Sequence, residues 1–268
     1  MRPLNSLLFV PGHRPERFDK ALAAGADAVI IDLEDAVAPS DKVASRDAIS
    51  AWLSPAHPVL LRINAAGTPW FAGDCSLLAR PGIAGVVLPK AERRDDIATV
   101  IAAGASEVLP LIESAAGFAN CRAIAGSPGV SRLIFGTIDF QADLAMRCTE
   151  EELLPFRTEF VLASRLADIN APIDGVCTAI DDAELLAQES LRARRLGFGG
   201  KLCIHPKQVA VVNHSFTPDA TEVDWARRVV AADAASGGAA VAIDGKMVDR
   251  PVVLRAKSIL LEAEARGA

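Results

Sequence analysis

The sequence of 268 residues lacks any apolar run that approaches the roughly 18 residues needed by a membrane-spanning helix. Its first residues, Met1-Arg2-Pro3, lead directly into a strand-like segment, without the apolar core of a signal peptide. Positive charge is not in excess, since 28 Lys and Arg stand against 34 Asp and Glu, for a formal net charge of −6. These absences predict a cytoplasmic protein whose main partner is neither a membrane nor a nucleic acid.

Closely spaced cysteine pairs are also missing. The five cysteines, at positions 75, 121, 148, 177 and 203, are odd in number and widely spaced, and no C-x-x-C occurs. A disulfide framework and a zinc site are therefore disfavoured, and the thiols are expected to be small core residues in a reducing compartment. The 19 glycines and 16 prolines are an ordinary number, which excludes a collagen-like or low-complexity chain.

Eight short runs rich in Val, Ile and Leu follow one another along the chain. They span residues 6–10, 28–33, 59–63, 85–88, 108–112, 132–135, 172–176 and 201–204. The runs are nearly continuous rather than alternating, which is typical of parallel strands covered on both faces. Eight such strands alternating with helices predict an α/β fold, the closed TIM (β/α)8 barrel. An open doubly wound sheet is the alternative, but it usually has fewer strands and a glycine-rich first turn, whereas residues 10–13 contain no G-x-G-x-x-G.

Helical patterns fill the intervals between these runs. They cover residues 14–24, 40–52, 95–103, 115–125, 150–169 and 181–196. Ser40 is a candidate N-cap for the second helix, and the helix at 150–169 is predicted to be the longest. Gly25, Gly104 and Gly197 stand where helices are expected to end.

The pattern changes after the eighth run. We place a barrel domain at residues 1–212 and a C-terminal helical extension at residues 213–268. The extension is predicted to contain a helix, a glycine break, a short strand, a turn and a final helix, at residues 219–236, 237–238, 239–243, 244–245 and 251–265. Because it is longer than barrel closure requires, we expect it to form a lid that covers the site or packs on a neighbouring subunit.

Charged side chains gather where the predicted strands end. A (β/α)8 barrel carries its reactive groups at the carboxyl ends of its strands. In chain order these ends carry Asp32, Glu34, Asp35, Arg62, Lys90, Glu113, Asp139, Asp174 and His205. The opposite strand ends carry far fewer charges. A ring of carboxylates with an Arg, a Lys and a His therefore marks the candidate site.

The carboxylates of this ring favour a metal ion. Carboxylates that converge on one mouth resist ionising together, and a divalent cation relieves that cost. Oxygen ligands without cysteine or paired histidine favour Mg²⁺, or Mn²⁺, over zinc. Glu113 and Asp139 end adjacent predicted strands and can share one ion, while Asp32, Glu34 and Asp35 can hold its waters. For any single Asp, the alternative is a helix cap or a loop anchor.

The basic residues near the ring each allow two interpretations. Arg62 is interpreted as a clamp for a substrate carboxylate, with ion pairing to the acidic ring as the alternative. Lys90 is a Schiff-base lysine or, equally, a charge-balancing or phosphate-contacting one. Arg14, Arg17 and Lys20 follow the first predicted strand and form either a phosphate-binding patch or a solvated face.

In this order the segments are similar to those of a known family. They are Leu8-Phe9-Val10-Pro11-Gly12, Asp32-Leu33-Glu34-Asp35-Ala36-Val37, Arg62-Ile63-Asn64, Leu88-Pro89-Lys90, Ile112-Glu113-Ser114-Ala115-Ala116-Gly117, Phe135-Gly136-Thr137-Ile138-Asp139-Phe140 and the stretch 200–208. The chain resembles the HpcH/HpaI aldolase and citrate lyase β-subunit family, on the CitE-like branch with malyl-CoA and citramalyl-CoA lyases. Ile138 departs from the pattern, because many relatives carry an acidic residue at that position.

The resemblance implies a TIM barrel, Mg²⁺ and a CoA thioester substrate. By motif, the implied metal ligands are Glu113 and Asp139, and Glu34 and Asp35 hold the waters of the metal. Arg62 is implied to bind the 2-oxoacid part of the substrate.

Further substrate contacts are expected from Gly136, Thr137 and Lys90, and Arg14 and Lys20 are expected to bind CoA because they are basic residues near the barrel mouth of an otherwise acidic protein. The segment 245–249 looks like the C-terminal lid of the family. In that lid an Asp reaches into the site of the neighbouring subunit, and the matching residue here is the remaining catalytic candidate, Asp249. The resemblance thus implies a homotrimer or a dimer of trimers.

The predicted activity is a Mg²⁺-dependent carbon–carbon lyase. It would cleave a 3-hydroxyacyl-CoA, such as malyl-, citramalyl- or citryl-CoA, to an acyl-CoA and a small 2-oxoacid in reversible Claisen-type chemistry. Three alternatives remain: a CoA thioesterase on the same scaffold, an aldolase acting on free oxoacids, and a subunit of a citrate lyase complex.

Overall fold

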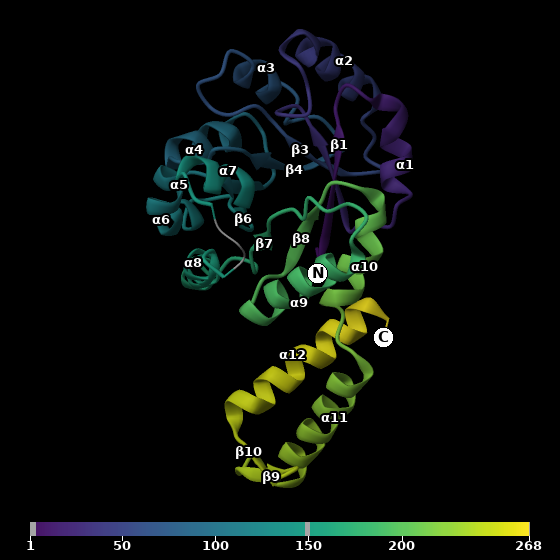
Figure 1. Ribbon diagram of the computed structural model, residues 1–268, viewed down its shortest axis with the longest axis vertical. Helices are drawn as coiled ribbons and strands as arrows, with labels where there is room; N and C mark the ends of the chain where they lie inside the picture. The colour runs from purple at the N-terminus through teal and green to yellow at the C-terminus, as the bar shows by residue number, and fades with distance from the viewer. Residues whose placement is uncertain (1–3, 148–150, 268) are drawn as a thin grey trace. The chain divides into compact units, whose positions relative to one another are not determined.

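The computed structural model describes residues 4–147 and 151–267, so Met1-Arg2-Pro3, Cys148 and the predicted helix start at Glu150 lie outside the described residues. The chain divides into two units, one spanning Leu4–Asn213 and the other containing the segment that begins at His214 (Figure 1). No helix among the described residues combines the length and the apolar character that crossing a bilayer takes.

Eight parallel strands close into a barrel in chain order, with the last strand pairing with the first (Figure 1). They are β1 (Ser6–Pro11), β2 (Ala28–Asp32), β3 (Val59–Arg62), β4 (Ile83–Leu88), β5 (Val108–Ile112), β6 (Ile134–Phe135), β7 (Ile173–Asp174) and β8 (Gly200–Cys203). All eight strands predicted from the apolar runs are present, and the predicted TIM barrel is confirmed. The open doubly wound sheet is excluded by the closed strand order.

Apolar side chains from all eight strands fill the core of the barrel. They are Leu7, Ile30, Leu60, Val87, Leu109, Leu111, Ile134, Ile173 and Leu202. A TIM-barrel interior is a packed core rather than a pore. The reactive groups are therefore confined to the strand ends and to the loops that follow them.

Helices and 3₁₀ turns connect the strands. They are η1 (Pro15–Arg17), α1 (Phe18–Leu22), η2 (Pro39–Asp41), α2 (Lys42–Trp52), α3 (Phe71–Cys75), α4 (Arg94–Ala102), α5 (Ala115–Ala119), α6 (Cys121–Ala125), α7 (Thr137–Asp143), α8 (Leu154–Leu166), α9 (Ala183–Leu196) and α10 (Pro206–Phe216). Three of these, α3, α7 and α10, were not predicted. Helix α7 matters most for the site, because it begins shortly after the two-residue β6 and carries Asp139.

Some helix predictions are wrong in detail. Ser40 does not cap α2, because it lies inside a 3₁₀ turn that begins at Pro39, and Asp41 precedes the helix instead. The predicted helix at 115–125 is two short helices, because Asn120 leaves helical geometry and its side-chain amide donates to the Glu92 carbonyl at 3.0 Å. The 13-residue α8 is shorter than the 17-residue α12 (Arg250–Arg266), so it is not the longest helix.

The second unit is a helical hairpin with a small two-stranded sheet (Figure 1). Its elements are α11 (Ala220–Ala235), β9 (Val241–Ile243), β10 (Lys246–Val248) and α12. Asp219 and Glu222 form a capping box that starts α11. The turn between the strands has positive φ at both Asp244 (50°) and Gly245 (74°), as the Asp-Gly dipeptide favours. The strand β10 was not predicted, and packing of this unit on a neighbouring subunit stays a prediction.

A buried ionic cluster fixes the last two strands of the barrel. Asp174, at the end of β7, accepts hydrogen bonds from Arg157 of α8 (2.9 Å) and from Lys201 of β8 (3.2 Å). Lys201 also lies 3.1 Å from Glu189 of α9. Burial alone would raise the pKa of Asp174, but the charges of Lys201 and Arg157 lower it. Placing Asp174 in the open acidic ring was therefore wrong, because its carboxylate is enclosed and paired.

Replacing Lys201 by Met should lower the free energy of unfolding by about 3–5 kcal/mol, because Glu189 and part of the Asp174 charge would be left buried without a counter-ion. Urea unfolding of the purified protein measures this. The control is Lys207→Met, which removes an equally charged lysine from a solvent-exposed pair with Asp181. Equal stability of the two variants would contradict a structural role for the cluster.

Candidate active site

A cavity of about 420 Å³ opens at the carboxyl ends of the strands. Its lining comes from β1, β2, β3, β5 and β8, from α7 and from residues that follow the strands. It comprises Phe9, Pro11, Asp32, Asp35, Ala36, Arg62, Leu111, Glu113, Gly136, Thr137, Ile138, Asp139, Gly175, Val176, Leu202 and Ile204. Four of the carboxylates predicted for the acidic ring thus share one cavity with the predicted arginine.

Arg62 and Asp32 form a bidentate ion pair across two neighbouring strands. The register places Asp32 of β2 beside Arg62 of β3, and the guanidinium donates from Nε at 2.7 Å and from Nη2 at 2.6 Å to the two carboxylate oxygens. Burial alone would lower the pKa of Arg62, but the hydrogen bonds and charge of Asp32 raise it. Asp32 also accepts from the backbone N–H groups of Glu34 and Ala36. Arg62 is therefore ion-paired, as the alternative interpretation predicted. It also lines the cavity, so a role in binding a substrate carboxylate stays a prediction.

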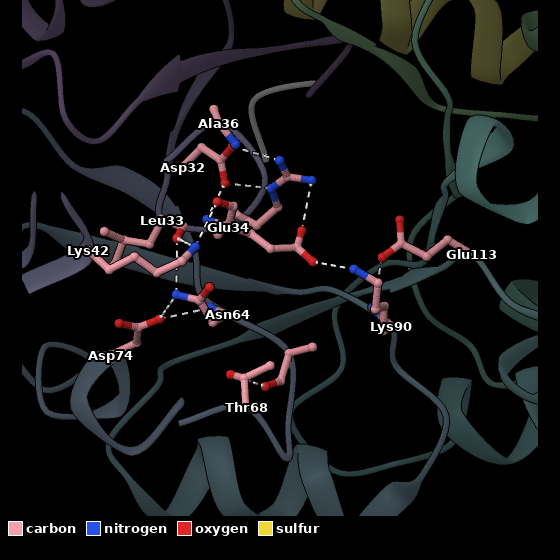
Figure 2. A network of polar contacts seen from close by, with 12 residues as sticks. Asp32, Leu33, Glu34, Ala36, Lys42, Asn64, Thr68, Asp74, Lys90 and Glu113 are labelled. Carbon is pink, nitrogen blue, oxygen red and sulfur yellow. Dashed lines mark hydrogen bonds and ion pairs between the residues drawn. The ribbon is translucent and has the colours of Figure 1, made fainter. Parts of the chain in front are cut away.

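Glu34 lies between two cations (Figure 2). Its Oε2 is 3.1 Å from Arg62 Nη1, and its Oε1 is 2.7 Å from Lys90 Nζ. Burial raises the pKa of Glu34 despite both positive neighbours. Glu34 and Lys90 line a second cavity of about 330 Å³, and Asp35 lines both cavities.

The surroundings of Lys90 favour its charged form. Desolvation works against its charge, but the hydrogen bond and charge of Glu34 raise the pKa of Lys90. A Schiff-base lysine needs a lowered pKa so that a free amine can attack a carbonyl. This disfavours the Schiff-base interpretation and favours a lysine that balances charge or contacts a phosphate. The backbone of Lys90 has φ +47° and its N–H donates to Glu113 at 2.8 Å, so this residue also holds the Glu113 carboxylate in place.

Glu113 is a buried carboxylate with other negative charges near it. It follows β5 directly and is only 4% exposed. Burial, followed by the charge of Glu34 and with a further contribution from Asp139, raises the pKa of Glu113 to about 8. Asp139 is exposed and lines the same cavity. It lies in the first turn of α7 rather than at a strand end, so the helix orients it.

The donor set at this cavity fits a magnesium ion. Glu113 and Asp139 are hard oxygen donors, and the raised pKa of Glu113 shows an electrostatic cost that a divalent cation would remove. No group of three or more Asp, Glu, His or Cys side chains arranged to hold a metal is found within residues 4–147 and 151–267. Mg²⁺ commonly uses one or two carboxylates and keeps waters in the remaining positions, so two ligands suffice.

Two glycines make room for the polar groups of the site. A Cβ on Gly136 would lie 2.6 Å from Cβ and 2.7 Å from Oε2 of Glu113. A Cβ on Gly175 would lie 2.4 Å from Oγ1 of Thr137. Gly136 therefore sets the position of the Glu113 carboxylate, and Gly175 that of the Thr137 hydroxyl.

A second layer of polar residues holds the backbone of the acidic segment (Figure 2). Lys42 Nζ donates to the carbonyls of Leu33 and Glu34 at 2.8 and 2.9 Å. Asn64 donates to the Leu33 carbonyl at 3.0 Å and to Asp74 at 2.6 Å. Sequence reasoning missed Lys42 and Asp74. A charged residue on an otherwise buried helix face was the signal available for Lys42, while Asp74 gave none, since α3 was not predicted.

The remaining predicted residues do not line either of these two cavities. Arg14, just before η1, and Arg17, at its end, both lie near Glu16, at 2.6 and 3.9 Å. Lys20 is exposed on α1. Asp249 stands at the N-cap position of α12, yet its side chain makes no capping hydrogen bond. The alternative role of Asp249 as a helix cap is therefore not met.

Comparison with known proteins identifies the family. Residues 5–206 match HpcH/HpaI aldolase/citrate lyase, and residues 154–268 match the carbon–carbon bond lyases of the TIM-barrel fold. The chain belongs to the HpcH/HpaI aldolase/citrate lyase family. Membership in this family makes the protein an enzyme that acts on carbon–carbon bonds, a lyase.

Relatives in the HpcH/HpaI family carry two kinds of description. A citrate lyase subunit beta-like protein of Deinococcus radiodurans is 38% identical, covering 96% of each chain. A (3S)-malyl-CoA thioesterase of Cereibacter sphaeroides is 34% identical, covering 99% of this chain and 96% of its own.

Solved structures of relatives hold ligands. CitE of Mycobacterium tuberculosis, in complex with magnesium, acetoacetate and coenzyme A, has a TM-score of 0.89 and 36% identity, over 98% of this chain and 100% of that one. A citrate lyase beta subunit of M. tuberculosis, complexed with oxaloacetate and magnesium, has a TM-score of 0.73 and 34% identity, over 81% and 98% of the two chains.

Replacing Gly136 by Ala should weaken Mg²⁺ binding by about 10- to 100-fold, because the new methyl group displaces the Glu113 carboxylate. Losses of this size are usual when a group that positions a metal ligand is changed. Isothermal titration with MgCl₂ measures this. Gly126→Ala is the matched control, since its Cβ would meet nothing closer than 3.6 Å. Unchanged Mg²⁺ affinity in a folded Gly136→Ala protein would contradict the assignment of Glu113.

Proposed function

We propose that the protein is a Mg²⁺-dependent lyase that cleaves a 3-hydroxyacyl-CoA to an acyl-CoA and a small 2-oxoacid, in reversible Claisen-type chemistry. The observation that carries the proposal is the buried Glu113, grouped with Asp139 and the paired Arg62 around one cavity at the barrel mouth. The magnesium, acid and coenzyme A bound by the M. tuberculosis relative support it.

Glu113 and Asp139 would hold the Mg²⁺, and Glu34 and Asp35 would accept hydrogen bonds from its waters. When bound, the ion supplies positive charge to the carboxylate and keto oxygens of the oxoacid. The positions of Asp35 and Glu34 are compatible with this role, because Asp35 lines both cavities and Glu34 lies 3.1 Å from Arg62 Nη1.

Arg62 stabilises the substrate's 3-oxygen, which gains negative charge when the hydroxyl loses its proton. Its Nε and one Nη2 hydrogen are used by Asp32, which fixes the guanidinium plane, and its Nη1 lies 3.1 Å from Glu34. The second Nη2 hydrogen remains for substrate. In cleavage the 3-hydroxyl gives its proton to a carboxylate that lines the cavity, its oxygen forms the keto group, and the bond between C2 and C3 breaks. The electron pair moves into the thioester enolate, which then takes up a proton at C2.

The other assigned residues complete this scheme. Gly136 and Thr137 border the oxoacid, and Lys90 balances the charge of Glu34 beside it. Arg14 and Lys20 contact the CoA phosphates. Asp249, supplied by a neighbouring copy in a homotrimer, is the acid that protonates the enolate.

A CoA thioesterase is the second candidate, favoured by the likeness to the (3S)-malyl-CoA thioesterase of C. sphaeroides. In that case a water held among the same carboxylates attacks the thioester carbonyl, and the acyl–sulfur bond breaks while the carbon skeleton stays intact. The products separate the two activities, because only a lyase releases a 2-oxoacid.

Incubation with malyl-, citramalyl- and citryl-CoA should release a 2-oxoacid and an acyl-CoA, with EDTA abolishing turnover and excess Mg²⁺ restoring it. Coupled dehydrogenase assays follow the oxoacid, and chromatography follows the CoA products. Asp139→Asn should lower kcat by at least about 100-fold, because a metal ligand is lost.

Asp143→Asn is the control for this assay, since Asp143 lies on the same helix but outside the cavity, where it caps the Ala115 N–H. Free CoA without oxoacid would indicate the thioesterase. Cleavage of only non-CoA hydroxy acids would indicate an aldolase, and activity appearing only with carrier subunits would indicate a citrate lyase complex.

Asp249→Ala and Glu113→Ala proteins should each be nearly inactive alone, yet recover part of the activity when unfolded together and reassembled. Mixed oligomers would contain some sites that draw an intact Asp249 and an intact Glu113 from different chains. Native mass spectrometry confirms mixing. No recovery in oligomers shown to be mixed would remove Asp249 from a shared site.

A further inference from the structure

The cations around the acidic segment are already engaged (Figure 2). Arg62 is bonded to Asp32 and lies against Glu34, and Lys90 is bonded to Glu34. Lys42 is buried and donates to two backbone carbonyls. Among the described residues that line the 420 Å³ cavity, Arg62 is the only cation, whereas four lining residues are carboxylates.

This imbalance limits the charge of a substrate. The lining residues sum to −3 when ionised, and a divalent ion would bring the sum to −1. One substrate carboxylate can bind to the metal and to Arg62. A second carboxylate would meet no further positive group among the lining residues and would add to an existing negative excess, and like charges in an enclosed site oppose binding strongly.

Apart from Thr137, the rest of the lining is apolar. Phe9 lies against the Arg62 guanidinium, whose Cζ is 4.7 Å from the ring centroid. Ile138, Val176 and Ile204 face the cavity from α7 and from the loops after β7 and β8, respectively. Ile138 and Ile204 are 49% and 38% exposed, so they present apolar surface that a substrate could cover. An apolar substituent gains from that contact, and a charged one loses its hydration.

We infer that the 2-oxoacid of this enzyme carries a single carboxylate and, on its keto carbon, hydrogen or a small apolar group. The inference rests on the proposed lyase function and makes it more specific. It selects acids of the pyruvate type and disfavours the dicarboxylate oxaloacetate. Because M. tuberculosis relatives were solved with pyruvate or with oxaloacetate, the family alone does not decide between these classes.

The test compares acids that separate charge from size. Isothermal titration in MgCl₂ should show pyruvate and 2-oxobutyrate binding at least about tenfold more tightly than freshly dissolved oxaloacetate. Because 2-oxobutyrate also extends beyond the keto carbon, its binding separates a charge effect from a lack of room. Condensation with acetyl-CoA and propionyl-CoA should show the same order in kcat/KM.

Two substitutions should move the preference in a predictable direction. Ile138→Lys and Ile204→Lys each add a cation to the cavity lining and should shift the oxaloacetate-to-pyruvate affinity ratio at least about fivefold toward oxaloacetate. The matched controls are Ile138→Gln and Ile204→Gln, which add a polar chain without charge and should leave this ratio near that of the wild type.

The outcomes keep this inference apart from the lyase proposal. Equal or tighter binding of oxaloacetate by the wild type, binding of none of the three acids, or a ratio that neither lysine moves would overturn the inference. If CoA esters are cleaved and oxaloacetate is the better acid, the lyase stands and the inference falls. If no CoA ester is cleaved while the acids bind in the expected order, the lyase proposal fails and the charge selectivity holds.

Discussion

The bidentate pair between Asp32 and Arg62 is the interaction on which the mouth of the barrel depends. It joins two neighbouring strands where they end, and it occupies one edge of the planar guanidinium. The third nitrogen, Nη1, then lies close to Glu34, which in turn holds Lys90. A point-like lysine ammonium could not make this planar double contact while leaving donors for a substrate.

Most of the barrel is predictable from the sequence because its strands are parallel. Strands covered on both faces need nearly continuous apolar runs, so each run identified a strand to within about two residues. The site followed from the same constraint, since the carboxyl ends of such strands meet at one mouth. Asp32, Arg62 and Glu113 were found in this way, and the bond between Asp32 and Arg62 follows from their register.

Other parts of the site depend on contacts between segments distant in sequence. Asp139 was assigned to a strand end, but β6 has only two residues and a helix begins at once, which gives this side chain a different support. Lys42 and Asp74 act on the backbone of a neighbouring loop, and no local spacing encodes that contact. The protonation of Lys90 was open for a similar reason, because it depends on Glu34, which lies 56 residues away.

Two groups of charged residues in the same barrel differ in their balance of charge, and the difference separates a structural role from a functional one. The cluster of Asp174, Glu189, Arg157 and Lys201 contains two negative and two positive side chains, so it is balanced and needs nothing from outside. The cavity lining, in contrast, has four carboxylates for one arginine and keeps an excess of negative charge. Folding alone gives no reason to retain such an excess, because like charges brought together cost free energy. A site that must accept a divalent cation gives a reason to retain the excess negative charge. The number of positive groups left free in that site then limits how much negative charge a substrate can carry.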